Sequence, residues 1–164
     1  MNQENNNFSI EKCNHCALRT LETNKKHTPL YGSGGNVIMV IDVKPGPIES
    51  FKKFLTTLNW PVDKTYFTSL LKCDCNEFDF INAEACYKHW LAQEIAMTNP
   101  LAIITLGSFV DNFIKSKNQN YTMYNLPHYL YIKSNVHLKD EWAKEIRVIF
   151  DTIKQTTRDM MAVC

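Results

Sequence analysis

Four cysteines have the residue type and spacing to hold a metal centre. Cys13 and Cys16 form a C-x-x-C pair, Cys73 ends an apolar run, and Cys86 falls in the first turns of an expected helix. A C-x-x-C pair can chelate one metal centre from a single turn of backbone, and two further thiolates complete a four-sulfur site. Disulfides, or simple burial of small apolar side chains, are the alternatives. We interpret the four thiols as a metal or cluster site that ties the N-terminal segment to the middle of the fold.

Length and composition indicate one globular domain. The chain has 164 residues and a formal net charge of +1, so no overall basic field indicates nucleic acid. We expect a flexible N-terminus over 1–9, a folded domain over 10–158 and a tail over 159–164. Residues 1–12 are polar, unlike a secretory signal, and no apolar run is long enough to cross a membrane. We therefore expect a cytoplasmic protein with no membrane partner, in which thiols stay reduced.

Strand-like apolar runs alternate with stretches of helical periodicity. This alternation predicts an α/β three-layer sandwich with a central, mainly parallel four-stranded sheet. We expect strands over 37–41, 66–71, 101–106 and 128–132, and helices over 48–58, 83–98 (capped by Asn82), 109–116 and a final one bearing Trp142 and Ile153. Ligands bind outside the C-terminal ends of such strands. That edge is expected to carry residues 42–47, 69–73, 107–108 and 133–137.

The order of these motifs resembles the iron–sulfur uracil-DNA glycosylases, the family 4 and family 5 type enzymes of the uracil-DNA glycosylase superfamily. The resemblance runs from about Cys13 to Ile149 through CNHC, GSGGNVIMVIDVKPG, YFTSLLKC and NPLAIITLG. It implies a uracil-DNA glycosylase-like fold and a structural 4Fe–4S cluster whose ligands are Cys13, Cys16, Cys73 and Cys86. Cys75 is a competitor for the place of Cys73, which is preferred because it follows a lysine as the family cysteine does.

The motifs that carry chemistry in that family match less well. The family acid that positions the attacking water falls at Val43, and Asp42 lies one position earlier. The resemblance makes Asp42 a candidate catalytic residue, with Pro45 and Gly46 beside it as substrate-binding residues. Capping the helix that follows is the structural alternative for Asp42.

Two further family positions are also changed. Ser69 stands where an asparagine reads the uracil edge, and a hydroxyl cannot supply the paired donor and acceptor of an amide. The family histidine, which stabilises charge on the departing base, has two possible placements. Matching the proline puts Leu126 there, whereas matching the expected strand puts the motif just before His137. We take His137 as the candidate, with simple exposure as its alternative.

These residues support three hypotheses. The first is a degenerate uracil-DNA glycosylase-like protein, linked to DNA repair or maintenance, that binds nucleic acid or a protein partner without excision. The second is an active DNA glycosylase of altered base specificity, and the third is an iron–sulfur redox sensor. DNA binding would use lysines near the cluster or the sheet edge, namely Lys25, Lys26, Lys44, Lys72 and Lys133.

Overall fold

A four-stranded parallel sheet forms the centre of the molecule. The computed structural model describes residues 13, 15, 16, 18, 38–45, 48–73, 75, 79–117 and 120–162. The strands are β1 (Ile38–Asp42), β2 (Thr65–Ser69), β3 (Ala102–Leu106) and β4 (Thr122–Leu126), in the order β2-β1-β3-β4. Every neighbouring pair is parallel, and β1 to β3 are buried along their whole length. The predicted α/β class with a parallel four-stranded sheet is confirmed.

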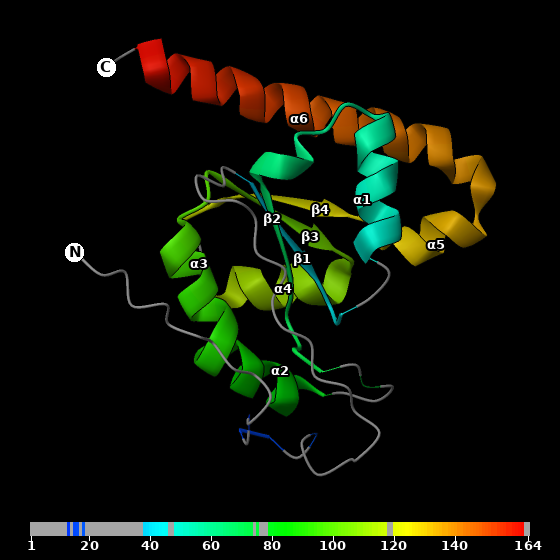
Figure 1. Ribbon diagram of the computed structural model, residues 1–164. Helices are drawn as coiled ribbons and strands as arrows, with labels where there is room; N and C mark the ends of the chain where they lie inside the picture. The colour runs from blue at the N-terminus through cyan, green and yellow to red at the C-terminus, as the bar shows by residue number, and fades with distance from the viewer. Residues whose placement is uncertain are drawn as a thin grey trace.

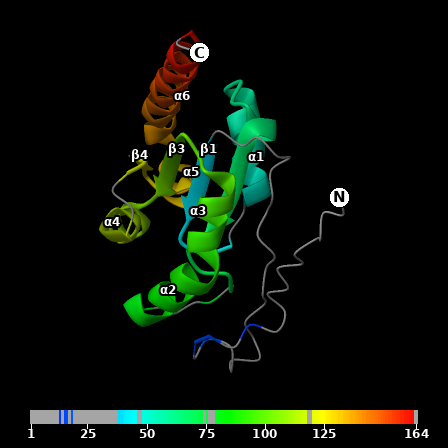
Figure 2. The same cartoon turned by 90° about the vertical axis from the view of Figure 1, so that its left-hand side faces the viewer.

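Helices cover both faces of this sheet (Figure 1). One face packs against α1 (Ile48–Thr57), α5 (Tyr129–Ser134) and α6 (Lys139–Ala162), with the short turns η3 (Val62–Lys64) and η5 (Val136–Leu138). The other face packs against α2 (Phe80–Cys86), η4 (Tyr87–Leu91), α3 (Ala92–Thr98) and α4 (Ser108–Lys117), as the turned view in Figure 2 shows. Alternating strand residues supply the two cores: Val40 faces the first set of helices and Met39 the second.

The helix that carries Cys86 begins at Phe80, three residues earlier than expected. Its N-cap is Asp79, whose carboxylate accepts a hydrogen bond of 2.7 Å from the Asn82 amide. The Asp79 backbone N–H in turn donates to the Asn82 side-chain oxygen, which completes a capping box. The expectation that Asn82 caps the helix is therefore wrong, because an acidic residue three positions earlier takes that role.

The fourth strand lies at residues 122–126 instead of 128–132. β4 is an edge strand with mostly exposed or half-buried side chains, so it lacks the continuous apolar run of a central strand. Residues 129–134 form α5, where the His128 side chain accepts the Leu130 amide as the helix cap. Aromatic and β-branched residues suggested a strand, and local capping overrides that preference. Residues 133–137 consequently lie in α5 and η5, beyond the sheet edge.

Helix α6 spans the full width of the first helical layer and continues to Ala162. Its buried face includes Trp142, Ile146 and Ile153, which pack in the core beneath α1 and α5, as the periodicity predicts. Within the described residues, no helix combines the length and the apolar character that a membrane span requires.

Candidate functional site

Asp42 and His128 form a hydrogen-bonded pair at the C-terminal edge of the sheet. Asp42 is the last residue of β1, and His128 follows β4 after Pro127. The His128 Nε2 donates to Asp42 Oδ1 at 3.0 Å, and the Val43 amide donates to the same oxygen at 2.6 Å. The Asp42 side chain is 8 % exposed and the His128 side chain 27 % exposed. This edge is where parallel α/β sheets place ligands, so the pair is the best candidate for chemistry.

The two nitrogens of His128 have different partners. Nδ1 accepts the Leu130 amide at 3.2 Å, so the neutral ring carries its proton on Nε2, facing Asp42. The hydrogen bond to Asp42 raises the pKa of His128 above its ordinary value of 6.5, and burial acts in the opposite direction. An imidazole with a raised pKa, hydrogen-bonded to a carboxylate, is a group that can take part in proton transfer.

A small cavity adjoins the pair. Its volume is about 10 Å³, and besides Asp42 and His128 it is lined by three aromatic residues and three strand residues, namely Phe51, Phe67, Tyr129, Val40, Thr68 and Leu106. That volume holds about one water molecule. The two bonds to the carboxylate described above both use Oδ1, so the second oxygen, Oδ2, is the one that can orient a water. The arrangement therefore joins a carboxylate, an imidazole and space for one water.

The other predicted site residues lie in different settings. Ser69 ends β2 beside Asp42, but its hydroxyl is buried and donates to the Leu71 carbonyl at 2.6 Å. Pro45 is half-buried after β1, and Gly46 lies outside the described residues. His137 is exposed in η5. The structure thus brings His128, and not His137, to Asp42.

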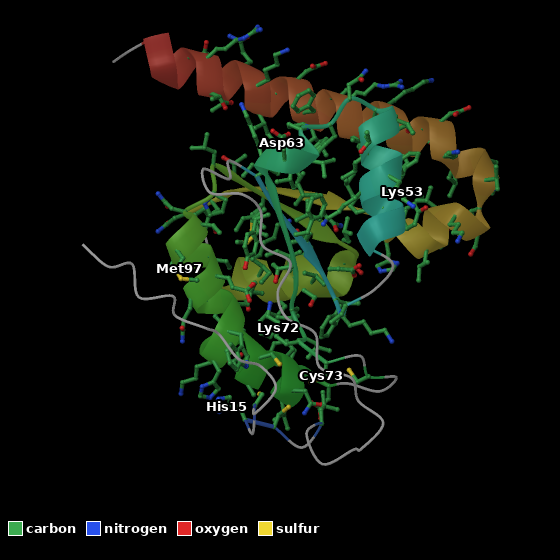
Figure 3. The ribbon with its side chains drawn as sticks, viewed as in Figure 1. His15, Lys53, Asp63, Lys72, Cys73 and Met97 are labelled. Carbon is green, nitrogen blue, oxygen red and sulfur yellow. The ribbon has the colours of Figure 1, made fainter. Side chains whose placement is uncertain are left out.

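Cys16, Cys73 and Cys86 lie close together, and Cys86 is the last residue of α2. Cys13, Cys73 and Cys86 are buried and Cys16 is half-buried, and these thiols are not in disulfides. Burial raises the pKa of Cys86 to about 12, with smaller contributions from Cys16 and Cys73, while a hydrogen bond from the Lys72 amide acts in the opposite direction. Figure 3 shows Cys73 and His15 on this same side of the molecule. The two cysteine pairs are therefore neighbours in space.

Cys16, Cys73 and Cys86 lie close enough to interact electrostatically, and the Lys72 backbone N–H donates a hydrogen bond to the Cys86 sulfur. Cys75 packs in an apolar cluster that also contains Cys86 and contacts Cys16, so this packing does not set Cys75 apart from the predicted ligands. Among the described residues, no group of three or more His, Cys, Asp or Glu side chains is arranged to hold a metal ion. The 4Fe–4S cluster therefore stays a prediction.

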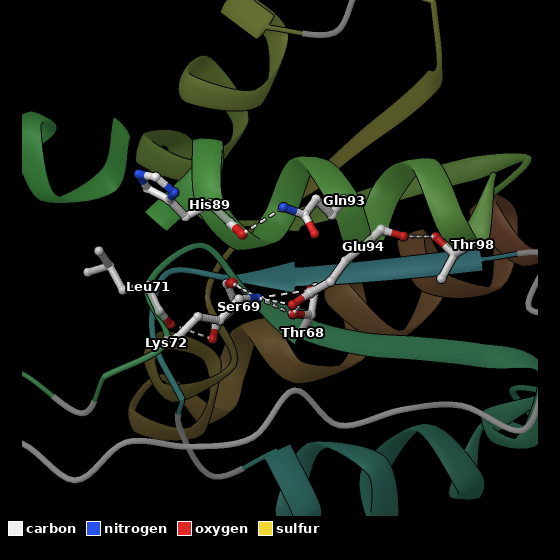
Figure 4. A network of polar contacts seen from close by, with 8 residues as sticks. All are labelled: Thr68, Ser69, Leu71, Lys72, His89, Gln93, Glu94 and Thr98. Atoms are coloured by element: carbon white, nitrogen blue, oxygen red, sulfur yellow. Dashed lines mark hydrogen bonds and ion pairs between the residues drawn. The ribbon is translucent and has the colours of Figure 1, made fainter. Parts of the chain in front are cut away.

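A buried ion pair lies directly beside the cysteines. The Lys72 ammonium is 2.9 Å from both carboxylate oxygens of Glu94 and 2.6 Å from the Thr68 hydroxyl. Figure 4 draws these three side chains and their contacts. Thr68 in turn donates to Glu94. Burial lowers the pKa of Lys72, and Glu94 opposes that effect. Lys72 is only 1 % exposed, so the expectation that it meets phosphates is wrong.

The other lysines expected to contact DNA lie in different environments. The Lys44 ammonium donates to the Cys75 carbonyl at 2.7 Å, and Lys133 is exposed on α5. Lys25 and Lys26 lie outside the described residues.

Sequence reasoning missed His128 and the Lys72–Glu94 pair. The signal for His128 was Pro127, because a proline beside a short apolar run favours a helix start over strand continuation. The Lys72–Glu94 pair had no comparable signal, since 21 residues separate its members in the chain.

A scan against protein-family models and a search of curated proteins found no match to this chain.

Proposed function

We propose that this protein is a nucleic-acid glycosylase of altered base specificity, built on a uracil-DNA glycosylase-like scaffold. The observation that carries the proposal is the Asp42–His128 pair beside a cavity for one water at the sheet edge. Hydrolysis of an N-glycosidic bond needs a positioned water and a carboxylate to take its proton. Both requirements have a candidate group at this edge.

The proposed roles follow from the hydrogen bonds. Asp42 orients the water through Oδ2 and accepts its proton as the water oxygen attacks the sugar C1′ carbon. The bond between C1′ and the base breaks, and its electron pair leaves with the base. His128 fixes the orientation of the Asp42 carboxylate through its Nε2–H, so it is a positioning residue in this scheme.

A glycosylase assay tests this proposal directly. Single- and double-stranded oligonucleotides bearing uracil, hypoxanthine and other damaged bases are the substrates. We expect Asp42→Asn to lower excision by roughly 10²-fold or more, as loss of a general base does. His128→Asn should lower it and shift the pH profile, whereas His137→Asn, an exposed matched control, should leave it unchanged. Excision by wild type that survives Asp42→Asn would refute the assignment.

A second candidate is binding without excision. The cavity of about 10 Å³ is too small for a nucleobase as it stands, and Asp42 and His128 are already bonded to one another. Under this alternative, anisotropy would show salt-dependent binding to uracil-containing and normal duplexes alike, with no excision of any base. Absence of binding at low salt would remove the nucleic-acid proposal in both forms, and would leave a protein partner or a redox-sensing role for the chain.

We also propose that Cys13, Cys16, Cys73 and Cys86 hold a 4Fe–4S cluster in a reducing cytoplasm. Such a cluster would supply a rigid link between the N-terminal segment and α2. Iron and sulfide content of anaerobically purified protein tests this. Cys13→Ala and Cys86→Ala should abolish the cluster and its brown colour, and Cys75→Ala should retain it. Wild-type protein without iron would refute the cluster.

A further inference from the structure

The outer edge of β4 is an open side of the sheet. In the part of the chain that the structure describes, β4 pairs with β3 alone, and Figure 2 shows it at the edge of the sheet. Thr122 and Asn125 are exposed, and Met123 and Tyr124 are half-buried. Solvent therefore reaches most of the strand.

Two residues of β4 point their backbone groups out of the sheet. The Leu126 carbonyl accepts the Gly107 amide at 2.8 Å, and the Tyr124 carbonyl accepts a side-chain hydroxyl of β3 at 3.3 Å, so both carbonyls face β3. The N–H and C=O groups of successive residues in a strand point to opposite sides. Those of Met123 and Asn125 consequently point away from β3, and they have no hydrogen-bond partner among the described residues.

This edge lacks the features that usually keep exposed strands from associating, which are charged side chains, prolines and bulges. Residues 118–126 read NQNYTMYNL and contain neither a charged residue nor a proline. β4 also pairs with β3 residue for residue, without a bulge. Because β4 carries no charge, a second β4 would meet no like charge on pairing with it.

We infer that the edge is occupied by a second copy of this chain, with the two β4 strands antiparallel about a twofold axis at Tyr124. In this register Met123 of each copy lies opposite Asn125 of the other, as hydrogen-bonded pairs. All outward backbone groups of both strands are then satisfied, and the two sheets become continuous. The two Tyr124 side chains meet at the axis as an aromatic cross-strand pair. Such a contact uses the same surface on both copies and closes as a dimer.

Sedimentation of the full chain over a wide range of concentration tests this inference, which does not depend on the proposed activity. We expect a reversible dimer. Met123→Pro removes an outward N–H from each copy and keeps the pairing with β3, because proline is tolerated where an edge N–H faces outward. This variant should weaken dimerisation roughly tenfold or more, the value of the lost hydrogen bonds.

Charges at the axis test the register. Tyr124→Lys and Tyr124→Glu each place two like charges opposite one another, so each variant alone should be monomeric. A mixture of the two variants should dimerise, because opposite charges then meet at the axis. Met97→Lys, which adds the same charge to an exposed residue of α3, is the matched control and should dimerise like wild type. Circular dichroism checks the fold of each variant, and if one position does not tolerate its change the other decides.

Amide hydrogen exchange of the wild type identifies what covers the edge. In the dimer the Met123 and Asn125 amides should be protected. Dilution to the monomer should release these two amides and leave the inward amides of Tyr124 and Leu126 protected. A chain that is monomeric at every concentration, or a dimer that no β4 variant weakens, overturns the inference. Protected Met123 and Asn125 amides in a monomer would instead place another segment of the same chain at this edge, and would also overturn it.

Discussion

His128 joins two parts of the chain that the sequence keeps far apart. It caps α5 through Nδ1 and bonds the end of β1 through Nε2. Each nitrogen therefore has a structural partner, and a change in the charge of the ring alters both hydrogen bonds.

The raised pKa of His128 predicts a pH dependence of stability. Because the pKa of His128 is higher in the folded protein than the ordinary 6.5, folding favours the protonated ring. This stabilisation is fully present below pH 6.5 and is lost as the pH rises through the raised folded pKa. Urea unfolding at several pH values checks this: the free energy of unfolding should decline over that window in wild type.

Asp42→Asn is the informative variant for the same measurement, because it removes the charge that raises the pKa of His128 while keeping the shape of the side chain. In this variant the free energy of unfolding should depend less on pH over the same window. A decline of the same size in Asp42→Asn would show that another group is responsible.

The Lys72–Glu94 pair predicts strong coupling between its members. Lys72→Met leaves a buried carboxylate without its cation, which typically costs about 3–5 kcal/mol. The double variant Lys72→Met/Glu94→Gln removes both charges and should be more stable than Lys72→Met alone. Denaturant unfolding measures both. Glu84→Gln, which breaks the exposed pair with Lys117, is the control and should cost less than about 1 kcal/mol.

At the scale of elements, the capping box fixes where α2 begins and hence where Cys86 lies. Asp79→Ala removes the acceptor of the Asn82 amide and should lower the free energy of unfolding by about 1 kcal/mol. Asp79→Asn keeps a capping oxygen, so its free energy of unfolding should be close to that of wild type. Thermal unfolding followed by circular dichroism compares the two, and equal losses in both variants would argue that the cap carries no stability.

The central elements could be predicted from the sequence because their patterns are strong. Buried parallel strands have continuous apolar runs in the sequence. The predicted bounds of β1 and β3 therefore agree with the observed ones to within one residue. β4 could not be recognised in this way, since an edge strand with exposed side chains has no such run. This error also changed the predicted site. Because the fourth strand was expected six residues too late, the histidine that follows it was taken to be His137 instead of His128.

At the scale of the whole molecule, the sheet order predicts a gradient of protection. In the part of the chain that the structure describes, β1 and β3 each pair with two strands, whereas β4 pairs with β3 alone and is mostly exposed or half-buried. Local opening is easiest where few buried contacts hold an element. Amide hydrogen exchange should therefore be slowest in β1 and β3 and clearly faster in β4. Protection of β4 equal to that of β3 would indicate that a further surface covers this edge.

The candidate site could be predicted only in part because it is assembled across the molecule. Asp42 was recognisable from its place after a strand, but its partner comes from a loop 86 residues later. Nothing in the local pattern around His128 encodes that contact.

The position of β1 has a consequence for synthesis on the ribosome. β1 is the first strand of the sheet in the chain, yet it ends up between β2 and β3. When the nascent chain has emerged only as far as Ser69, β1 can pair with β2 along one edge. Its other edge stays unpaired until β3 (Ala102–Leu106) has been synthesised. Unpaired apolar strand edges are templates for association with other chains. Translational pausing between these two points would therefore increase the demand of this protein for chaperones.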